Sequence, residues 1–251
     1  MAQYSFGSGD LFAVPTMDAS GSVIVNPTPI QFAALQEVSV DYSGDIKELY
    51  GENSFPIDVA RGKVKISVKA KSAQIFGALY ASCFFGSALS TGQNRIITNL
   101  AGTVTTGAYT VTLGGATFVG DLGVKNSQNV PLTRVSSAPA NANEYSVNTS
   151  TGAYTFHTSN NSQVLFFSYI VSDAAIGKTL TVTNLPMGYI PEFSLYLDIG
   201  YKGKNGCLIF DRVVSSKLGF ATKLDDHVIP DFDMSVMALP NGAVSRMSFS
   251  E

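Results

Sequence analysis

Two segments in the first third of the chain alternate between apolar and polar residues. In residues 37–42, and again in residues 63–70, the even-numbered positions are apolar and the odd-numbered positions are polar or charged. A repeat of two residues is the period of a β-strand with one buried face. If the two strands pair antiparallel, Glu37 and Asp41 share a face with the lysines of the second segment, where opposite charges attract. The pattern predicts a sheet with one charged, wet face and one buried face.

The two strands are separated by a polar segment, residues 43–62. It contains Gly44, Gly51, Pro56 and Gly62, residue types that interrupt regular structure. We therefore expect a long loop that is tethered at both ends.

One segment has the composition of a buried helix. Residues 72–85 are apolar on nearly every side, which is typical of a helix without a solvent-facing surface. Ser72 is a suitable N-cap, and Gly86 is suitable as the residue that follows the last turn. We expect a helix over 72–85 that flanks the sheet.

The rest of the chain carries strand patterns. Between residues 92 and 171 Thr, Gly, Asn and Ser dominate, and short strands are expected at 103–113, 116–119, 144–147, 153–157 and 164–171. Further strands are expected at 179–183, 192–201, 207–214 and 228–236.

These elements predict a mainly β protein of packed antiparallel sheets, a sandwich or barrel, with one flanking helix. We expect a core formed by residues 35–99 and 172–237, with residues 100–171 as an inserted, outward-facing β subregion. Residues 1–34 are rich in Gly, Ser and Pro and are interpreted as an N-terminal arm, and residues 238–251 as a C-terminal arm.

The amino-acid composition of the chain limits the kinds of partner that it can bind. Only 14% of the residues are charged and the net charge is −3, so no basic face is expected to seek phosphates. The low charge suits a surface partly covered by partners, or equally a β-sandwich coated with Ser, Thr and Asn. No run of roughly 18 apolar residues predicts membrane insertion. Without a signal-peptide pattern, we expect Cys83 and Cys207 to be buried, reduced thiols in a chain that folds in the cytoplasm.

Residues with catalytic potential are few. His157 lies at a strand end with no acid nearby in the sequence, and His227 lies among four aspartates, at positions 225, 226, 231 and 233. A charged turn is the better interpretation of that cluster, because Ile229 and Pro230 replace the glycine-centred spacing of a calcium loop. A metalloprotein or hydrolase centred there is the weakest alternative. We expect no catalytic residue, no cofactor and no metal.

The most specific pattern lies in residues 35–86. A strand leads to Leu-Tyr-Gly at 49–51, a Phe-Pro step at 55–56, Ala-Arg-Gly-Lys at 60–63 entering a second strand, and then the helix. This order resembles the major tail proteins, or tail-tube proteins, of long-tailed bacteriophages. A looser match covers residues 121–124, 145–147, 152–156 and 168–169. Together the matches cover roughly half of the chain.

The resemblance implies a virion protein whose copies form hexameric rings that stack into a tail tube, through which DNA passes without sequence-specific binding. The implied partners are further copies of the chain and the tail-tip or baseplate, tape-measure and terminator proteins. The segment 43–62 would form the contact between rings. Its self-assembly residues would be Tyr50, Phe55, Pro56, Ile57 and Arg61. The alternative is a receptor- or carbohydrate-binding tail module, suggested by the Ser/Thr/Asn-rich region 100–165.

Overall fold

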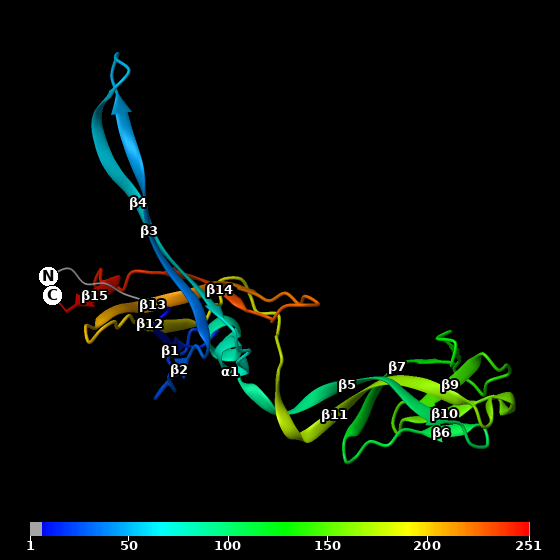
Figure 1. Ribbon diagram of the computed structural model, residues 1–251. Coiled ribbons are helices and arrows are strands. Elements are labelled where there is room, and N and C mark those ends of the chain that lie inside the picture. Colours follow the sequence, from blue (N-terminus) through cyan, green and yellow to red (C-terminus); the bar gives the residue numbers. More distant parts are fainter. Residues whose placement is uncertain (1–6, 251) are drawn as a thin grey trace. The chain divides into compact units, whose positions relative to one another are not determined.

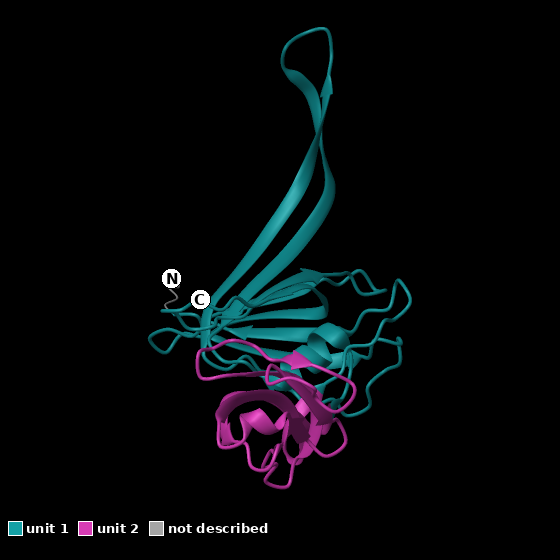
Figure 2. Ribbon diagram, turned by 90° about the vertical axis from the view of Figure 1, so that its right-hand side faces the viewer, with its two compact units in different colours: residues 1–89, 180–251 teal, residues 90–179 magenta. Residues whose placement is uncertain are grey.

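The computed structural model describes residues 7–250, and it divides into two compact units (Figures 1 and 2). Unit 1 comprises residues 1–89 and 180–251, and unit 2 comprises residues 90–179. The inserted region is therefore wider than the predicted 100–171. The reason is that two long strands, β5 (Leu89–Thr103) and β11 (Val164–Leu180), lead into and out of it. The fold is mainly β, with antiparallel sheets and one short helical segment, as predicted.

Unit 1 is built on one eight-stranded sheet. Its order is β2-β1-β12-β13-β14-β4-β3, and β15 also pairs with β13. The strands are β1 (Asp10–Met17), β2 (Ile30–Gln31), β3 (Leu35–Tyr50), β4 (Pro56–Ser72), β12 (Glu192–Asp198), β13 (Gly206–Gly219), β14 (Asp231–Val236) and β15 (Ser245–Phe249). Every pair in this sheet is antiparallel. The predicted pairing of the two alternating segments is confirmed, because Val40 lies opposite Val68 and Glu37 opposite Lys71.

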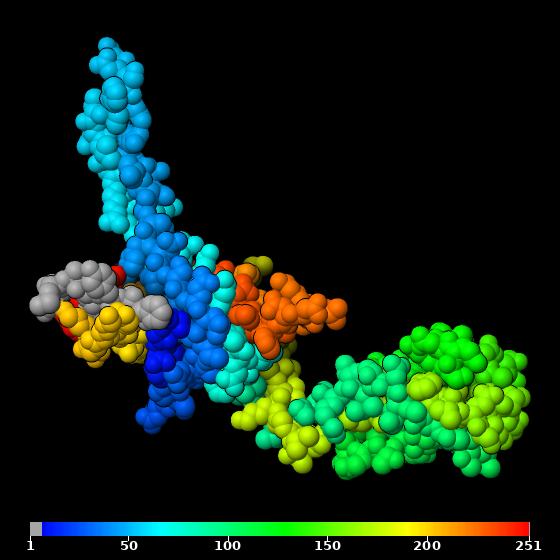
Figure 3. Space-filling view, viewed as in Figure 1, coloured from blue at the N-terminus to red at the C-terminus, as the bar shows by residue number. Residues whose placement is uncertain are grey.

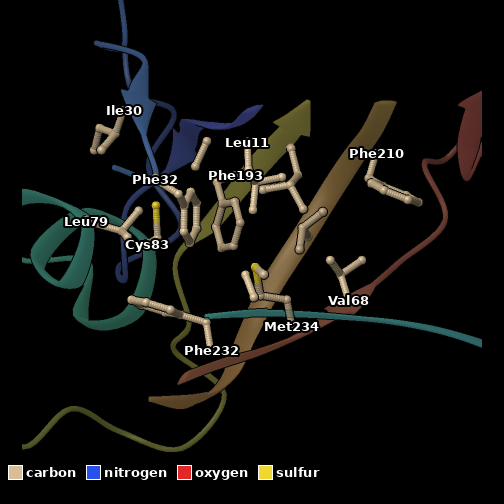
Figure 4. Close-up of a cluster of buried hydrophobic side chains, with 14 of the residues drawn as sticks. Leu11, Ile30, Phe32, Val68, Leu79, Cys83, Phe193, Phe210, Phe232 and Met234 are labelled. Atoms are coloured by element: carbon tan, nitrogen blue, oxygen red, sulfur yellow. The ribbon is translucent and has the colours of Figure 1, made fainter. Parts of the chain in front are cut away.

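One face of this sheet forms the core of unit 1 (Figure 4). Alternate residues of the central strands are fully buried, among them Val68, Phe193, Phe210 and Met234. The short helix α1 (Gly77–Leu79) continues directly into a π-helical turn (Tyr80–Phe85), and Leu79 and Cys83 from this segment join the same core. The helical segment therefore flanks the sheet, as expected.

The helix begins later than predicted. Ser72 is not an N-cap but the last residue of β4, where its hydroxyl donates a hydrogen bond of 2.6 Å to the Ala33 carbonyl oxygen. The alternation of β4 carries Ser72 onto the buried face, so a neighbouring backbone satisfies its hydroxyl. The predicted end is confirmed, because Gly86 takes the left-handed conformation (φ 60°) that glycine adopts most readily.

Both predicted arms contain strands of the sheet. Within residues 1–34, β1 pairs with β12, and its Leu11 and Ala13 side chains are fully buried; residues 1–6 lie outside the described part. Pro15 does not break the strand because it lies next to a β-bulge, where proline is tolerated. Within residues 238–251, β15 pairs with β13. The arm interpretation was therefore wrong for 10–17 and 245–249.

Unit 2 has its own two sheets and its own core. One sheet has the order β6-β10-β9-β8 and the other β5-β11-β7. The additional strands are β6 (Ala108–Thr110), β7 (Thr117–Lys125), β8 (Thr133–Arg134), β9 (Glu144–Asn148) and β10 (Ala153–Phe156), with a short 3-10 helix at Thr158–Asn160. Aromatic side chains dominate the core, with Tyr154 and Phe167 in edge-to-face contact at 5.0 Å. Within residues 7–250, no helix is long and apolar enough to span a membrane.

Candidate self-assembly surface

The segment between the two alternating strands is a β-hairpin rather than a loop. β3 and β4 pair almost continuously from Leu35–Ser72 to Tyr50–Pro56, and only residues 51–55 form the turn. The predicted loop over 43–62 was therefore wrong. Gly51 lies in the turn, whereas Gly44 borders and Gly62 lies within a β-bulge at which the register shifts. Pro56 is the first residue of its strand, where it need not donate a ladder hydrogen bond.

The outer part of this hairpin, residues 42–64, is here called the hairpin arm. β4 pairs with β14 only from Ile66 to Lys71. Among the described residues, β3 and β4 therefore have only each other as pairing partners beyond that point. Figures 1 and 3 show the arm extending away from the rest of unit 1.

The apolar side of the core sheet continues along the arm. The pair of Val40, partly buried, and Val68, fully buried, is followed on the same face by Tyr42–Ile66 and then by Gly44–Val64. After the bulge, Ile46 lies opposite Arg61, and Glu48 lies opposite Val59. Ile46, Val59 and Val64 thus continue the core row, interrupted by Arg61 and Glu48 on the same face, and 65%, 55% and 51% of their surfaces are exposed.

Such exposure is unusual for an isolated molecule. A two-stranded hairpin alone is marginally stable in water, and several large apolar side chains exposed on one face usually mark an interaction site. Burying a side chain of this kind contributes roughly 1.5–3 kcal/mol. The arm therefore has the composition and geometry of a surface that a partner covers.

The five predicted self-assembly residues all lie on the arm. Phe55 is in the turn and is 82% exposed, Tyr50 lies opposite Pro56, and Ile57 and Arg61 are on β4. The Tyr50 hydroxyl donates a hydrogen bond to the Glu48 carboxylate, which raises the pKa of the phenol.

The alternating segments of the sequence included Tyr42 and Val64, but sequence reasoning missed Ile46 and Val59, which lie on the same face further along the arm. The signal was weak, because Gly44, Glu48 and Arg61 interrupt the apolar positions on this face. It was hidden by the bulge, which adds one residue to β4 and thereby changes the phase of the alternation.

The opposite face of the sheet is charged, as predicted. A row of alternating charge crosses four strands, from Lys217 through Asp231 and Lys71 to Glu37. The Lys217–Asp231 and Lys71–Glu37 pairs are each 2.6 Å apart, and Asp231 lies opposite Lys71 in the register. The hydrogen bond to Glu37 raises the pKa of Lys71, and the charge of Asp231 adds to this shift. The charges are exposed and balanced, so the row contributes little to stability and forms no basic stripe.

Both ends of the sheet leave backbone groups for a partner. In the described part of the chain, β3 pairs with β4 alone, so its outer edge is open along 16 residues. At the other end, β2 pairs only with Phe12 and Ala13 of β1. Open edges of this kind template the addition of another strand.

The aspartate-rich segment near His227 forms a turn. Lys223 pairs with Asp226 at 3.8 Å, and the His227 backbone N–H donates to the Asp226 carboxylate. Across residues 7–250, no group of three or more His, Cys, Asp or Glu side chains is placed to hold a metal ion. His157 caps the 3-10 helix by accepting a hydrogen bond from the Ser159 backbone N–H.

No protein-family model matches this chain, and no curated protein is significantly similar to it in sequence.

Proposed function

We propose that this chain is the tail-tube subunit of a long-tailed phage, a structural protein whose copies form hexameric rings that stack into a conduit for DNA. The observation that carries the proposal is the hairpin arm, on which the apolar row of the core sheet continues into solvent. A subunit of a stacked assembly needs such a surface, because it is covered only when the next copy is in place.

The open edges of the sheet support the proposal that copies of the chain form a ring. The outer edge of β3 and the sparsely covered edge of β1 lie at opposite ends of one sheet. Pairing the β3 edge of one copy with the β1 edge of the next satisfies both sets of backbone groups and joins the sheets into a closed barrel. The same geometry repeated around an axis generates a ring.

The charged face of the sheet is suited to line the inside of the proposed tube. The core face is covered by the helical segment, so the face that carries the Lys217–Asp231–Lys71–Glu37 row is the one free to meet DNA. A row of alternating sign offers no continuous positive stripe for phosphates, so DNA slides past it. The proposed location is the tail tube of the virion, after assembly in the host cytoplasm. The proposed partners are the tail-tip or baseplate, tape-measure and terminator proteins.

The direct test is electron microscopy of the purified chain at increasing concentration, together with light scattering. Rings with sixfold symmetry, or tubes built from them, are expected. A chain that remains monomeric at high concentration, even when tail-initiator complexes are added, contradicts the proposal.

A further inference from the structure

A cavity of about 590 Å³ opens in unit 2 between three connecting segments. These are the turn after β7, the residues before β9, and the residues between the 3-10 helix and β11. The volume lies in the roughly 300–1,000 Å³ range of small-molecule sites.

The walls of this cavity are held in place by amide side chains. Asn126 Oδ1 accepts hydrogen bonds from the backbone N–H groups of Gln128 (3.0 Å) and Val130 (2.9 Å), which fixes the turn. Asn160, which is only 1% exposed, donates from Nδ2 to the Ala142 carbonyl oxygen at 2.9 Å and ties the second wall to the third. The cavity is therefore a built feature of unit 2.

The lining combines amides with aliphatic groups. Its polar side chains are those of Asn126, Ser127, Gln128, Asn143, Asn160 and Gln163, and its apolar part includes Val130, Leu132 and Leu165. No charged or aromatic residue is among the described residues that line it. Gln128 and Asn143 are exposed residues of the lining, so their side-chain amides are accessible to a ligand.

This chemistry selects a class of ligand. Phosphates, carboxylates and metal ions need a compensating charge, which the lining does not provide. An amide presents both a donor and an acceptor, the pair that matches the neighbouring hydroxyl groups of a sugar. The aliphatic part can contact the C–H groups of a sugar ring.

We propose that this cavity is a binding site for a neutral carbohydrate, with Gln128 and Asn143 as its principal hydrogen-bonding residues. The proposal does not depend on the tail-tube function, because the site lies entirely within unit 2.

The test is saturation-transfer difference NMR on the full chain, a method that tolerates large assemblies because it observes the ligand. The probes are the methyl glycosides of glucose, galactose and N-acetylglucosamine, together with a trisaccharide of each. Transfer to at least one neutral sugar is expected, and glucose 6-phosphate and glucuronate should receive less. An absence of transfer to every neutral sugar overturns the proposal.

Substitutions in the cavity lining test whether the sugar binds there. Gln128→Leu and Asn143→Leu should each weaken binding about fivefold or more, because each removes at least one hydrogen bond. Asn94→Leu, at an exposed position of β5, should leave binding unchanged. Binding that survives both cavity substitutions overturns the assignment. If a trisaccharide binds at least tenfold more tightly than its monosaccharide, the natural ligand is a polymer such as a surface glycan. Equal affinities indicate that the natural ligand is a free sugar.

Discussion

The Tyr154 hydroxyl donates a hydrogen bond of 2.9 Å to Oδ1 of Asp121, whose side chain is only 2% exposed. The Tyr145 hydroxyl donates to the other carboxylate oxygen at 2.7 Å, and Arg134 lies 3.8 Å away. One buried carboxylate on β7 thus anchors two tyrosines from the facing sheet, on β9 and β10. Without it, two buried hydroxyl groups lose their acceptor.

Replacing this carboxylate should destabilise unit 2. We expect Asp121→Ala to lower the free energy of unfolding of unit 2 by about 3 kcal/mol, because buried hydrogen bonds to a charged group are strong and unpaired buried donors are costly. Tyr154→Phe removes one donor only and should cost about 1 kcal/mol. Calorimetry of each variant measures the effect. The control is Asp173→Ala, which removes the ion pair of Asp173 with Arg95, nearer the surface. An equal loss of unfolding free energy in this variant would contradict a special role for Asp121.

The same tyrosines predict a response to alkaline pH. Burial, and then the neighbouring Asp121, raise the pKa of Tyr154 and of Tyr145. A folded-state pKa above the unfolded value means that the contribution to stability is complete below about pH 10, the unfolded pKa. It is then lost as the pH rises further. The melting temperature of unit 2 should therefore stay level up to about pH 10 and fall as the pH rises above it, and the fall should be smaller in Tyr145→Phe.

Assembly should depend on the tip of the hairpin arm. We expect Phe55→Asp to raise the concentration needed for assembly at least tenfold, because it replaces an apolar contact of roughly 2 kcal/mol with a charge. The β-sheet circular dichroism should not change, since Phe55 is not in the core. Asn53→Asp adds the same charge in the same turn and serves as the matched control. Normal tubes from Phe55→Asp would show that the turn does not mediate stacking.

The two faces of the arm should differ in their importance. Ile46 lies on the face that continues the core row, whereas Leu49 lies on the other face, opposite Asp58. Both side chains are more than half exposed. We expect Ile46→Lys to abolish or strongly weaken assembly in light-scattering assays, and Leu49→Lys to have a smaller effect. A larger effect of Leu49→Lys than of Ile46→Lys would assign the contact between copies to the face that carries Leu49.

The two cysteines should differ in reactivity. Cys83 is buried, and burial raises the pKa of its thiol to about 12, so the thiolate is rare at pH 8. Cys207 is partly exposed, a correction to the expectation that both are buried. Iodoacetamide at pH 8 should therefore modify one thiol per folded chain and both after unfolding in guanidinium. The Cys207→Ser variant should take up no label while folded.

The sequence predicted those features that depend on neighbouring residues. The pairing of the two alternating segments, the charged face and the glycine that ends the helix all follow from local patterns. β1 was missed because its partner β12 lies about 180 residues away, where Asp10 meets Asp198. The strand character of the arm was missed because glycine and proline were interpreted as ends, although at a bulge or a strand start they are compatible with pairing. The cavity in unit 2 could not be predicted, because its lining comes from three separated segments.

The two ends of unit 2 lie side by side. The Ser90 hydroxyl donates to the Thr179 carbonyl oxygen at 3.1 Å, and the Thr179 hydroxyl donates to the Gly92 carbonyl oxygen at 2.7 Å. A module whose entry and exit meet in this way can be removed or exchanged without stretching the chain on either side. In the laboratory, the same junction is a natural position for displaying foreign domains.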